Sequence, residues 1–134
     1  MRNEQLFTSK SDEHYTPRKV IDRALDMWGE IDLDPCSNSR MFPNVPSKKQ
    51  YTAYQNGLLL PWGGCVFVNP PYSDMAAWTE KAIREYGRGV EILYLTAART
   101  DTKWFQLLED YPVCFIELIL KDFFNFPGMG NIIF

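Results

Sequence analysis

The chain has 134 residues, of which 46% are hydrophobic, and its formal net charge is -3. This length suits one globular domain, which we expect over residues 15–134 after a flexible polar arm at residues 1–14. The acidic charge disfavours an extended grip on DNA, because affinity for nucleic acid depends largely on neutralising phosphates. Any contact with nucleic acid should therefore be local, weak, or shared with a second subunit or a partner protein.

The composition gives little support for metal, disulfide or membrane chemistry. The three cysteines, Cys36, Cys65 and Cys114, have no C-x-x-C spacing, and His14 is the only histidine. This argues against a disulfide framework, a zinc site and a histidine-dependent triad. The polar N-terminus lacks an apolar signal core, and no window reaches the length of a membrane span. The sequence therefore predicts a reduced cytoplasmic protein without a metal or membrane partner.

Helical and strand patterns alternate along the chain, which favours a layered α/β fold with a mostly parallel sheet. Residues 40–62 are rich in Pro, Asn, Ser, Lys and Tyr and show no clear element. In chain order we expect a helix over 16–28, strands over 30–34 and 64–68, a helix over 75–87, a strand over 90–98, a helix over 101–110, and strands over 113–120 and 131–134.

Capping residues mark the ends of the expected helices. Thr16 is the expected N-cap of the first helix, with Pro17 at its first helical position. Asp74 is the expected N-cap of the second helix, which Gly87 ends, and Asp101 that of the third. The apolar face of the second helix should comprise Met75, Trp78, Ala82, Ile83 and Tyr86.

Three loops are expected to meet at one edge of the sheet. They are "DPCSNS" after Leu33, "NPPYSD" after Val68 and "RTDTKWF" after Ala98. In open α/β sheets, ligands bind beyond the carboxyl ends of the strands. This convergence is the main residue-level argument for a functional site.

The "NPPY" segment can bind an amino group. Asn69 Oδ1 and the Pro70 carbonyl oxygen can both accept hydrogen bonds from one exocyclic amine, while Pro70 and Pro71 restrict the turn. Tyr72 offers a flat face on which a base could stack. A planar, amine-bearing ring drawn out of its helix would suit such a pocket. The alternative is a plain structural turn, since N-P and P-P are common turn dipeptides.

The other loops have alternatives of the same kind. Asp34 either caps a turn or approaches the amino group of an amino-acid-like cofactor. Arg99 is a candidate for a phosphate or carboxylate contact, whereas an ordinary solvated loop is the preferred interpretation of Lys48 and Lys49. The residues considered for DNA contact are Lys48, Lys49, Arg99, Asp101 and Lys103, with Arg40 as a further basic position.

Four segments, taken together, carry a family resemblance. "HYTPRKVIDRAL", "GEIDLDPCS", "QNGLLLPWGGCVFVNPPYS" and "TAARTDTKWF" resemble, in this order, the phage-type, Dam-like DNA adenine-N6 methyltransferases of phages and prophages. The resemblance runs from about His14 to Ile116 and implies a Rossmann-like fold that binds S-adenosylmethionine. It implies that Asn69, Pro70, Pro71 and Tyr72 hold the target adenine. The implied cofactor-binding residues are Tyr15, Thr16, Pro17, Asp34, Pro35, Cys36, Asn56 and Asn69.

The implied reaction is direct methyl transfer to adenine N6, flipped out of double-stranded DNA, in a bacterial host cell. By resemblance, the Asn69 and Pro70 oxygens orient N6 while it attacks the methyl group of the cofactor. The implied role is modification that protects DNA from restriction. The alternatives are methylation of cytosine N4 or of a protein glutamine, and a non-catalytic remnant that binds nucleic acid or cofactor.

The chain departs from the family pattern in three places. Asn56 occupies the position where the family usually has aspartate. After Ile116 the resemblance lapses, and the apolar segment "ELILKDFFNFPGMGNIIF" suggests a small fold shortened at its C-terminus. No stretch resembles a dedicated target-recognition domain. The recognition sequence is therefore not readable from the chain.

Overall fold

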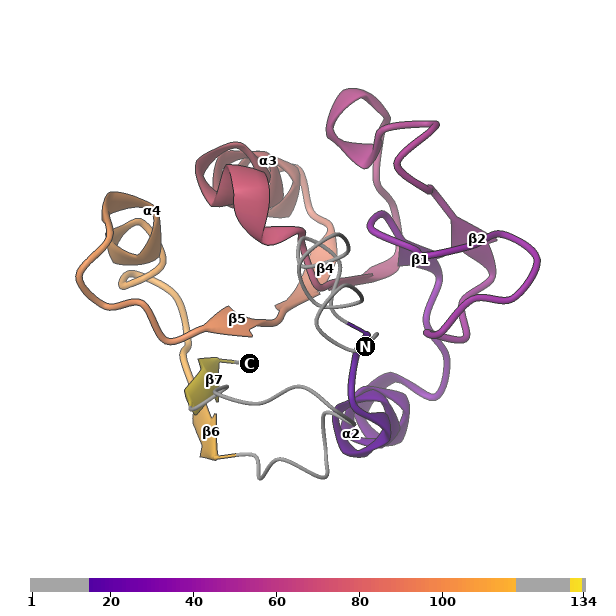
Figure 1. The fold of residues 1–134 in the computed structure, drawn as a ribbon, viewed down its shortest axis with the longest axis horizontal. Coiled ribbons are helices and arrows are strands. Elements are labelled where there is room, and N and C mark those ends of the chain that lie inside the picture. The colour runs from indigo at the N-terminus through magenta and orange to yellow at the C-terminus, as the bar shows by residue number, and fades with distance from the viewer. Residues whose placement is uncertain (1–14, 118–130, 134) are drawn as a thin grey trace, which may run out of the picture.

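The computed structural model describes residues 15–117 and 131–133. Helices cover both faces of a central sheet, with α2 on one side and α3 and α4 on the other (Figure 1). The expected arm at residues 1–14 lies outside the described residues. The elements are α2 (Arg18–Trp28), β1 (Leu33–Asp34), β2 (Lys49–Gln50), the 3-10 helix η1 (Gly57–Leu59), β3 (Cys65–Val68), the 3-10 helix η2 (Tyr72–Asp74), α3 (Met75–Gly87), β4 (Glu91–Tyr94), β5 (Thr96–Ala97), α4 (Lys103–Gln106), β6 (Phe115–Glu117) and β7 (Asn131–Ile133).

The sheet is mostly parallel, as predicted. Strands β2, β1, β3 and β4 lie side by side in that order, and every pairing among them is parallel. The strand expected over 90–98 is divided at Leu95 into β4 and β5. Strand β5 belongs to a second sheet of order β5-β7-β6, in which β7 is antiparallel to both neighbours. Residues 91–97 therefore contribute one strand to each of the two sheets.

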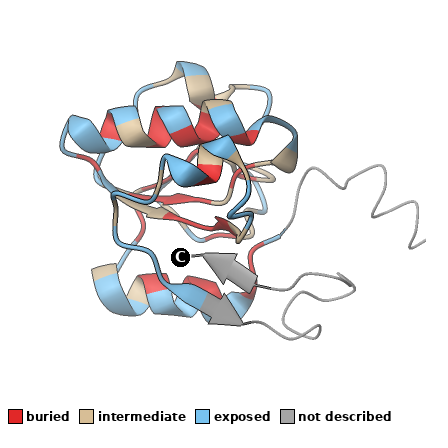
Figure 2. Cartoon of the chain, turned by 90° about the vertical axis from the view of Figure 1, so that its left-hand side faces the viewer, coloured by how far each residue is buried: buried red, intermediate tan, exposed pale blue. Residues whose placement is uncertain are grey.

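Alternate side chains of β3 pack against the helices on the two opposite faces of the sheet. Val66 and Val68 belong to a core cluster with Trp78 of α3, whereas Phe67 belongs to a cluster with Ile21 of α2. All three β3 side chains are completely buried. Successive side chains of a strand point to opposite faces, so a continuous apolar run suits a strand covered on both sides. Figure 2 shows that the buried positions of α2 and α3 lie on the sides turned toward the sheet.

Helix α2 begins at Arg18, one residue later than predicted, and its cap also differs from the prediction. Pro17 occupies the N-cap position, and no side chain caps the first turn. Thr16 was expected to do so, but its hydroxyl oxygen accepts a hydrogen bond from Asn69 instead. The helix ends at Trp28, where Gly29 has a φ of 83° and donates its N–H to the Leu25 carbonyl.

Helix α3 confirms the predicted cap at Asp74 and most of the predicted apolar face. Asp74 Oδ1 accepts from the Ala77 N–H at 3.4 Å. Tyr86 is the exception, because 51% of it is exposed and its ring lies edge-on to Tyr111. Tyr86 is the penultimate residue of the helix.

The last predicted helix is shorter than expected. Helix α4 covers only Lys103–Gln106, and Thr102 rather than Asp101 caps it, through Oγ1 accepting from the Phe105 N–H at 3.3 Å. Asp101 forms an exposed ion pair with Arg99 at 3.5 Å.

Residues 40–62, expected to have no clear element, contain β2 and η1. Both are two or three residues long, which is below the length at which periodicity can be recognised in a sequence. No helix within the described residues combines the length and apolar composition that crossing a membrane requires.

Candidate functional site

The loops that follow β1, β2 and β3 surround a cavity of about 320 Å³. This volume lies in the range of small-molecule sites. The sequence-predicted residues that line it are Tyr15, Thr16, Asp34, Pro35, Cys36, Asn56, Asn69 and Pro71. The predicted loops "DPCSNS" and "NPPYSD" contribute further lining residues, namely Ser37, Asn38, Ser73 and Asp74. Residues that the sequence did not suggest also line it, namely Asn44, Val45, Thr52, Ala53, Gly57, Leu58 and Trp78.

Asp34 places a buried carboxylate in the wall of this cavity. Only 3% of the residue is exposed, and its Oδ1 accepts a hydrogen bond from the Cys36 N–H at 2.9 Å. Burial raises the pKa of Asp34 to about 7, against the smaller lowering effect of that hydrogen bond. The turn-capping interpretation of Asp34 is thus confirmed, and the same carboxylate faces a space that a cationic group could enter.

The Asn69 side chain is hydrogen-bonded to the segment that precedes α2. Its Nδ2 donates to Thr16 Oγ1 at 3.0 Å, and the Thr16 carbonyl oxygen accepts from Asn44 Nδ2 at 3.1 Å. Thr16 is 6% exposed, so water competes little for these bonds. Segments far apart in sequence are thereby held together at the cavity.

The "NPPY" residues do not all face the cavity. Asn69 and Pro71 line it, whereas Pro70 and Tyr72 are not among its lining residues. Tyr72 is half-buried and packs against the core cluster beneath α3. Burial raises the pKa of Tyr72 to about 12. The ring expected to stack a base is therefore partly engaged in the core.

A tight turn after β2 forms another wall. Gly57 lies against the Pro35 carbonyl, and its own carbonyl accepts from Trp62 Nε1 at 2.9 Å. Asn56 has a φ of 64°, and its side-chain oxygen accepts from the Leu58 N–H at 3.1 Å. Asparagine tolerates this left-handed conformation better than most residues do. The Asn-Gly pair is a turn signal that could have located this wall in the sequence.

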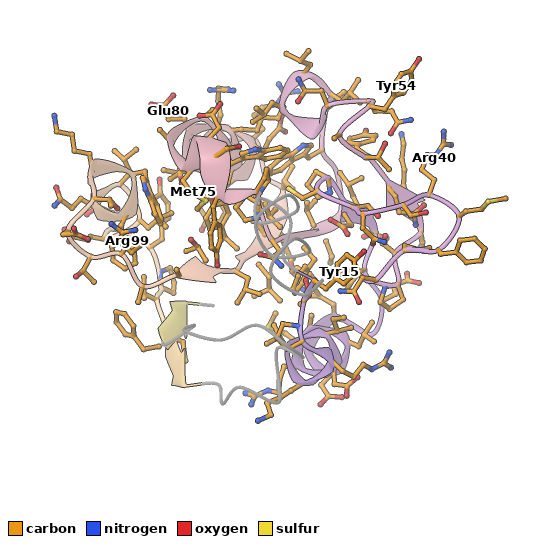
Figure 3. The ribbon with its side chains drawn as sticks, in the orientation of Figure 1. Tyr15, Arg40, Tyr54, Met75, Glu80 and Arg99 are labelled. Atoms are coloured by element: carbon orange, nitrogen blue, oxygen red, sulfur yellow. The ribbon has the colours of Figure 1, made fainter. Side chains whose placement is uncertain are left out.

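The third predicted loop does not join the other two. None of Arg99, Asp101 and Lys103 lines the cavity. Figure 3 shows Arg99 on the opposite side of the molecule from Arg40 and Tyr54, with Tyr15 between them. The extension of the strand beyond Leu95 explains the difference, because β5 carries the chain into the second sheet before this loop begins.

Lys48 and Lys49, two of the three lysines considered for DNA contact, are engaged with other side chains. Lys48 Nζ lies 2.9 Å from Glu30 and 3.4 Å from Asp32, and these carboxylates raise the pKa of Lys48. Lys49 Nζ lies 5.3 Å from the centre of the Tyr51 ring. These contacts fit the expectation of an ordinary solvated loop.

Arg40 and Tyr54 border a shallow second depression beside the cavity. The two hollows share Asn38 and Thr52 as lining residues. Tyr54 is 94% exposed, and Arg40 is exposed as well. Within the described ranges, no group of three His, Cys, Asp or Glu residues could hold a metal ion.

Comparison with known proteins identifies the family. The sequence profile of the family described as "DNA N-6-adenine-methyltransferase (Dam)" matches residues 3–133. A DNA N-6-adenine-methyltransferase of Escherichia phage T1 is 34% identical over 92 residues, which are 67% of this chain and 37% of that protein. No solved structure matches. The profile match extends through residue 133, so the expectation that the resemblance lapses after Ile116 was wrong. The chain therefore belongs to the Dam family of DNA N-6-adenine-methyltransferases.

Proposed function

We propose that this chain transfers a methyl group from S-adenosylmethionine to N6 of an adenine flipped out of double-stranded DNA. Its family and its phage T1 relative support adenine as the target. The chain spans 37% of that relative's length. The observation that carries the proposal is that a single cavity joins the buried Asp34 carboxylate to the Asn69 amide. In a phage or prophage context, such methylation would protect DNA from restriction.

The chemistry of the cavity suits this cofactor. A carboxylate that is almost fully buried is stabilised by a cationic partner, and the methionine portion of S-adenosylmethionine carries an ammonium group. Asp34 would hold that ammonium group, and the walls formed by Pro35, Cys36 and Asn56 would enclose the remainder. When bound, S-adenosylmethionine supplies a methyl group activated by a positively charged sulfur.

The chain's part in the reaction is to position the target amine. Asn69 Oδ1 and the Pro70 carbonyl oxygen would accept hydrogen bonds from the N6 amino group and turn its lone pair toward the methyl group. As the N6–carbon bond forms and the carbon–sulfur bond breaks, positive charge grows on N6 and these oxygens stabilise it. The surplus N6 proton then passes to water. No side chain forms a covalent bond in this sequence of events.

Methyl transfer to DNA tests the proposal. Full-length protein is incubated with S-adenosylmethionine and unmethylated bacterial DNA, and the digested nucleosides are identified by mass spectrometry. We expect N6-methyladenine, and we expect Asn69→Ala to reduce its formation by roughly 100-fold or more, as for the loss of other preorganised polar groups. Asn69→Ala should leave cofactor affinity within a few-fold of wild type.

The possible products distinguish the alternatives. Detection of N4-methylcytosine, or of methylglutamine in an added protein substrate, would identify a target other than adenine. The cavity would then keep its proposed role in binding the cofactor. A folded protein that binds S-adenosylmethionine but yields no methylated product would leave the non-catalytic remnant as the better description.

A further inference from the structure

We infer that Trp62 is a positioning residue for the cavity, which joins the turn at Gly57 to helix α3 from behind the cavity wall. Trp62 does not itself line the cavity, but it contacts two residues that do, Gly57 and Trp78. Only 6% of Trp62 is exposed, so it acts through these neighbours rather than on a ligand. The inference rests on the proposed function only where it concerns S-adenosylmethionine.

The hydrogen bond between Trp62 and Gly57 has only one possible direction. An indole N–H can only donate and a carbonyl oxygen can only accept, so Trp62 Nε1 donates to the Gly57 oxygen, at 2.9 Å. The bond is buried, and losing one partner of a buried hydrogen bond leaves the other unsatisfied. Trp62 therefore holds the backbone of the residue that lies against the Pro35 carbonyl oxygen.

Two side chains of α3 hold the indole ring. The Trp78 ring is stacked on that of Trp62, with ring centres 6.3 Å apart and an angle of 23° between the planes. Lys81 Nζ lies 5.4 Å from the centre of the Trp62 ring, within the range of a cation–π contact. Trp78 and Lys81 are three positions apart, so they lie on one face of the helix.

The groups around the indole are themselves fixed. Lys81 Nζ forms an ion pair of 2.6 Å with Glu85, and the two side chains are only 8% and 5% exposed. Separating a buried pair leaves an uncompensated charge, which opposes any displacement of Lys81. The Tyr51 hydroxyl donates to the carbonyl oxygen of Pro61, the residue before Trp62, at 2.9 Å. The indole is thus held through its ring and through its own backbone.

These contacts link two sides of the cavity. Gly57 belongs to the turn that we propose encloses the cofactor, whereas α3 begins directly after the "NPPYSD" loop that we propose holds the target amine. A movement of the turn relative to α3 would change the space between cofactor and target. Trp62 opposes this movement, because it is bonded to the turn and packed on the helix.

The first experiment compares Trp62→Phe with the matched control Trp28→Phe. Each substitution keeps an aromatic ring and removes one indole hydrogen bond, since Trp28 Nε1 donates to Glu91 Oε1 at 3.1 Å. Trp28 packs on the opposite core cluster and does not line the cavity. In fully folded protein, Trp62→Phe should raise the Kd for S-adenosylmethionine by about tenfold, as for one lost buried hydrogen bond. Trp28→Phe should leave this Kd within about twofold of wild type.

A purely structural role for Trp62 predicts a different result. Trp62→Phe would then lower the free energy of unfolding, while its folded fraction bound S-adenosylmethionine as tightly as the wild type does. That outcome would overturn the inference. Equal losses of affinity in Trp62→Phe and Trp28→Phe would overturn it as well.

A measurement without ligand separates this inference from the proposed function. The Leu58 N–H donates to Asn56 Oδ1 at 3.1 Å, so its hydrogen exchange reports on the order of the turn. Relative to the core amides of β3, it should exchange about tenfold faster in Trp62→Phe and at an unchanged rate in Trp28→Phe. This response in a protein that does not bind S-adenosylmethionine would refute the proposed function and retain the link. An unchanged rate in Trp62→Phe would refute the link whatever the affinity.

The unsubstituted protein gives a test that does not depend on the folding of a variant. In ¹⁵N-labelled protein, the indole N–H signal of Trp62 is assigned by its nuclear Overhauser contacts with Trp78. Saturation with S-adenosylmethionine should shift this signal and leave that of Trp28 in place. An unshifted Trp62 signal in protein saturated with S-adenosylmethionine would overturn the inference.

Discussion

Gly57 lies so close to the carbonyl oxygen of Pro35 that no side chain fits at position 57. A Cβ there would also meet the Pro35 Cβ at 3.0 Å and its carbonyl carbon at 3.2 Å. This contact brings the turn after β2 against the loop after β1. Two walls of the cavity are therefore packed directly against one another, backbone to backbone.

Gly57→Ala should consequently open the cavity and destabilise the fold. Overpacking of this kind costs about 1–3 kcal/mol, because rigid backbone must move. We expect a lower free energy of unfolding in urea and a weaker affinity for S-adenosylmethionine. Gly63→Ala is the matched control, because a Cβ at Gly63 meets nothing within 4 Å. Similar behaviour of the two variants would show that the Pro35 contact is not what excludes a side chain.

The stability of the protein should depend on pH through Asp34. Its pKa rises from 3.8 to about 7 on folding, so the folded state holds the proton more tightly than the unfolded chain between these values. The free energy of unfolding should therefore fall as pH rises from about 4 to about 7, by at most about 1.4 kcal/mol for each pH unit. In Asp34→Asn this decline should be absent, whereas the exposed Asp26→Asn should retain it. Urea denaturation at several pH values gives the measurement.

Cofactor affinity should have the opposite dependence on pH. The ionised form of Asp34 attracts a cation, so the affinity for S-adenosylmethionine should increase as pH passes through about 7. Asp34→Asn should bind weakly and without this dependence. Isothermal titration calorimetry of both proteins between pH 6 and pH 8 would check the prediction. A pH-independent affinity in the wild type would contradict the role assigned to Asp34.

Two buried threonines should respond in opposite directions to the same substitution. The Thr96 hydroxyl has no partner among the described residues, while Thr79 Oγ1 shares a hydrogen bond of 2.8 Å with the Tyr94 hydroxyl. Thr96→Val should raise the free energy of unfolding by about 1 kcal/mol, because it removes an unsatisfied polar group. Thr79→Val should lower it by about 1–3 kcal/mol, because it leaves the Tyr94 hydroxyl without this partner. Parallel denaturation curves provide the comparison.

Tyr72 should affect both stability and DNA engagement. Its ring packs against the core cluster, so Tyr72→Ala should destabilise the fold and also lose roughly 1–3 kcal/mol of base stacking. Tyr72→Phe keeps the ring and should retain the stacking contribution. The KM for DNA, measured where each variant is fully folded, separates the two effects. A normal KM in folded Tyr72→Ala would argue against a stacking role.

The sequence predicted the elements whose signals are local and strong. Buried β3 is a continuous apolar run, and Asp74 precedes a clear apolar stripe, so both were recognised. Two predicted N-caps, Thr16 and Asp101, were wrong because another residue takes the hydrogen bond or the capping position. The Thr16 hydroxyl oxygen accepts a hydrogen bond from the Asn69 amide, and Thr102 lies one residue nearer to α4 than Asp101 does.

The site was predicted where it depends on two neighbouring strands, and missed where it depends on tertiary packing. Asp34 ends β1 and Asn69 directly follows β3, and these two strands pair with each other, so the proximity of the two residues followed from topology. Asn44 and Gly57 line the cavity from segments without periodicity. The place of Asn44 depends on side-chain amide hydrogen bonds that no local pattern reveals. The Asn-Gly pair marks the turn at Gly57, but not its close contact with Pro35.

The buried carboxylate of Asp34 has a consequence for the protein's lifetime in a cell. A ligand that binds only the folded state raises its stability by about 2.7 kcal/mol when it is present at a hundred times its Kd. Proteases act on the unfolded fraction, which such a ligand depletes about a hundredfold. If Asp34 binds the cofactor as proposed, the abundance of the protein should therefore follow the supply of that cofactor.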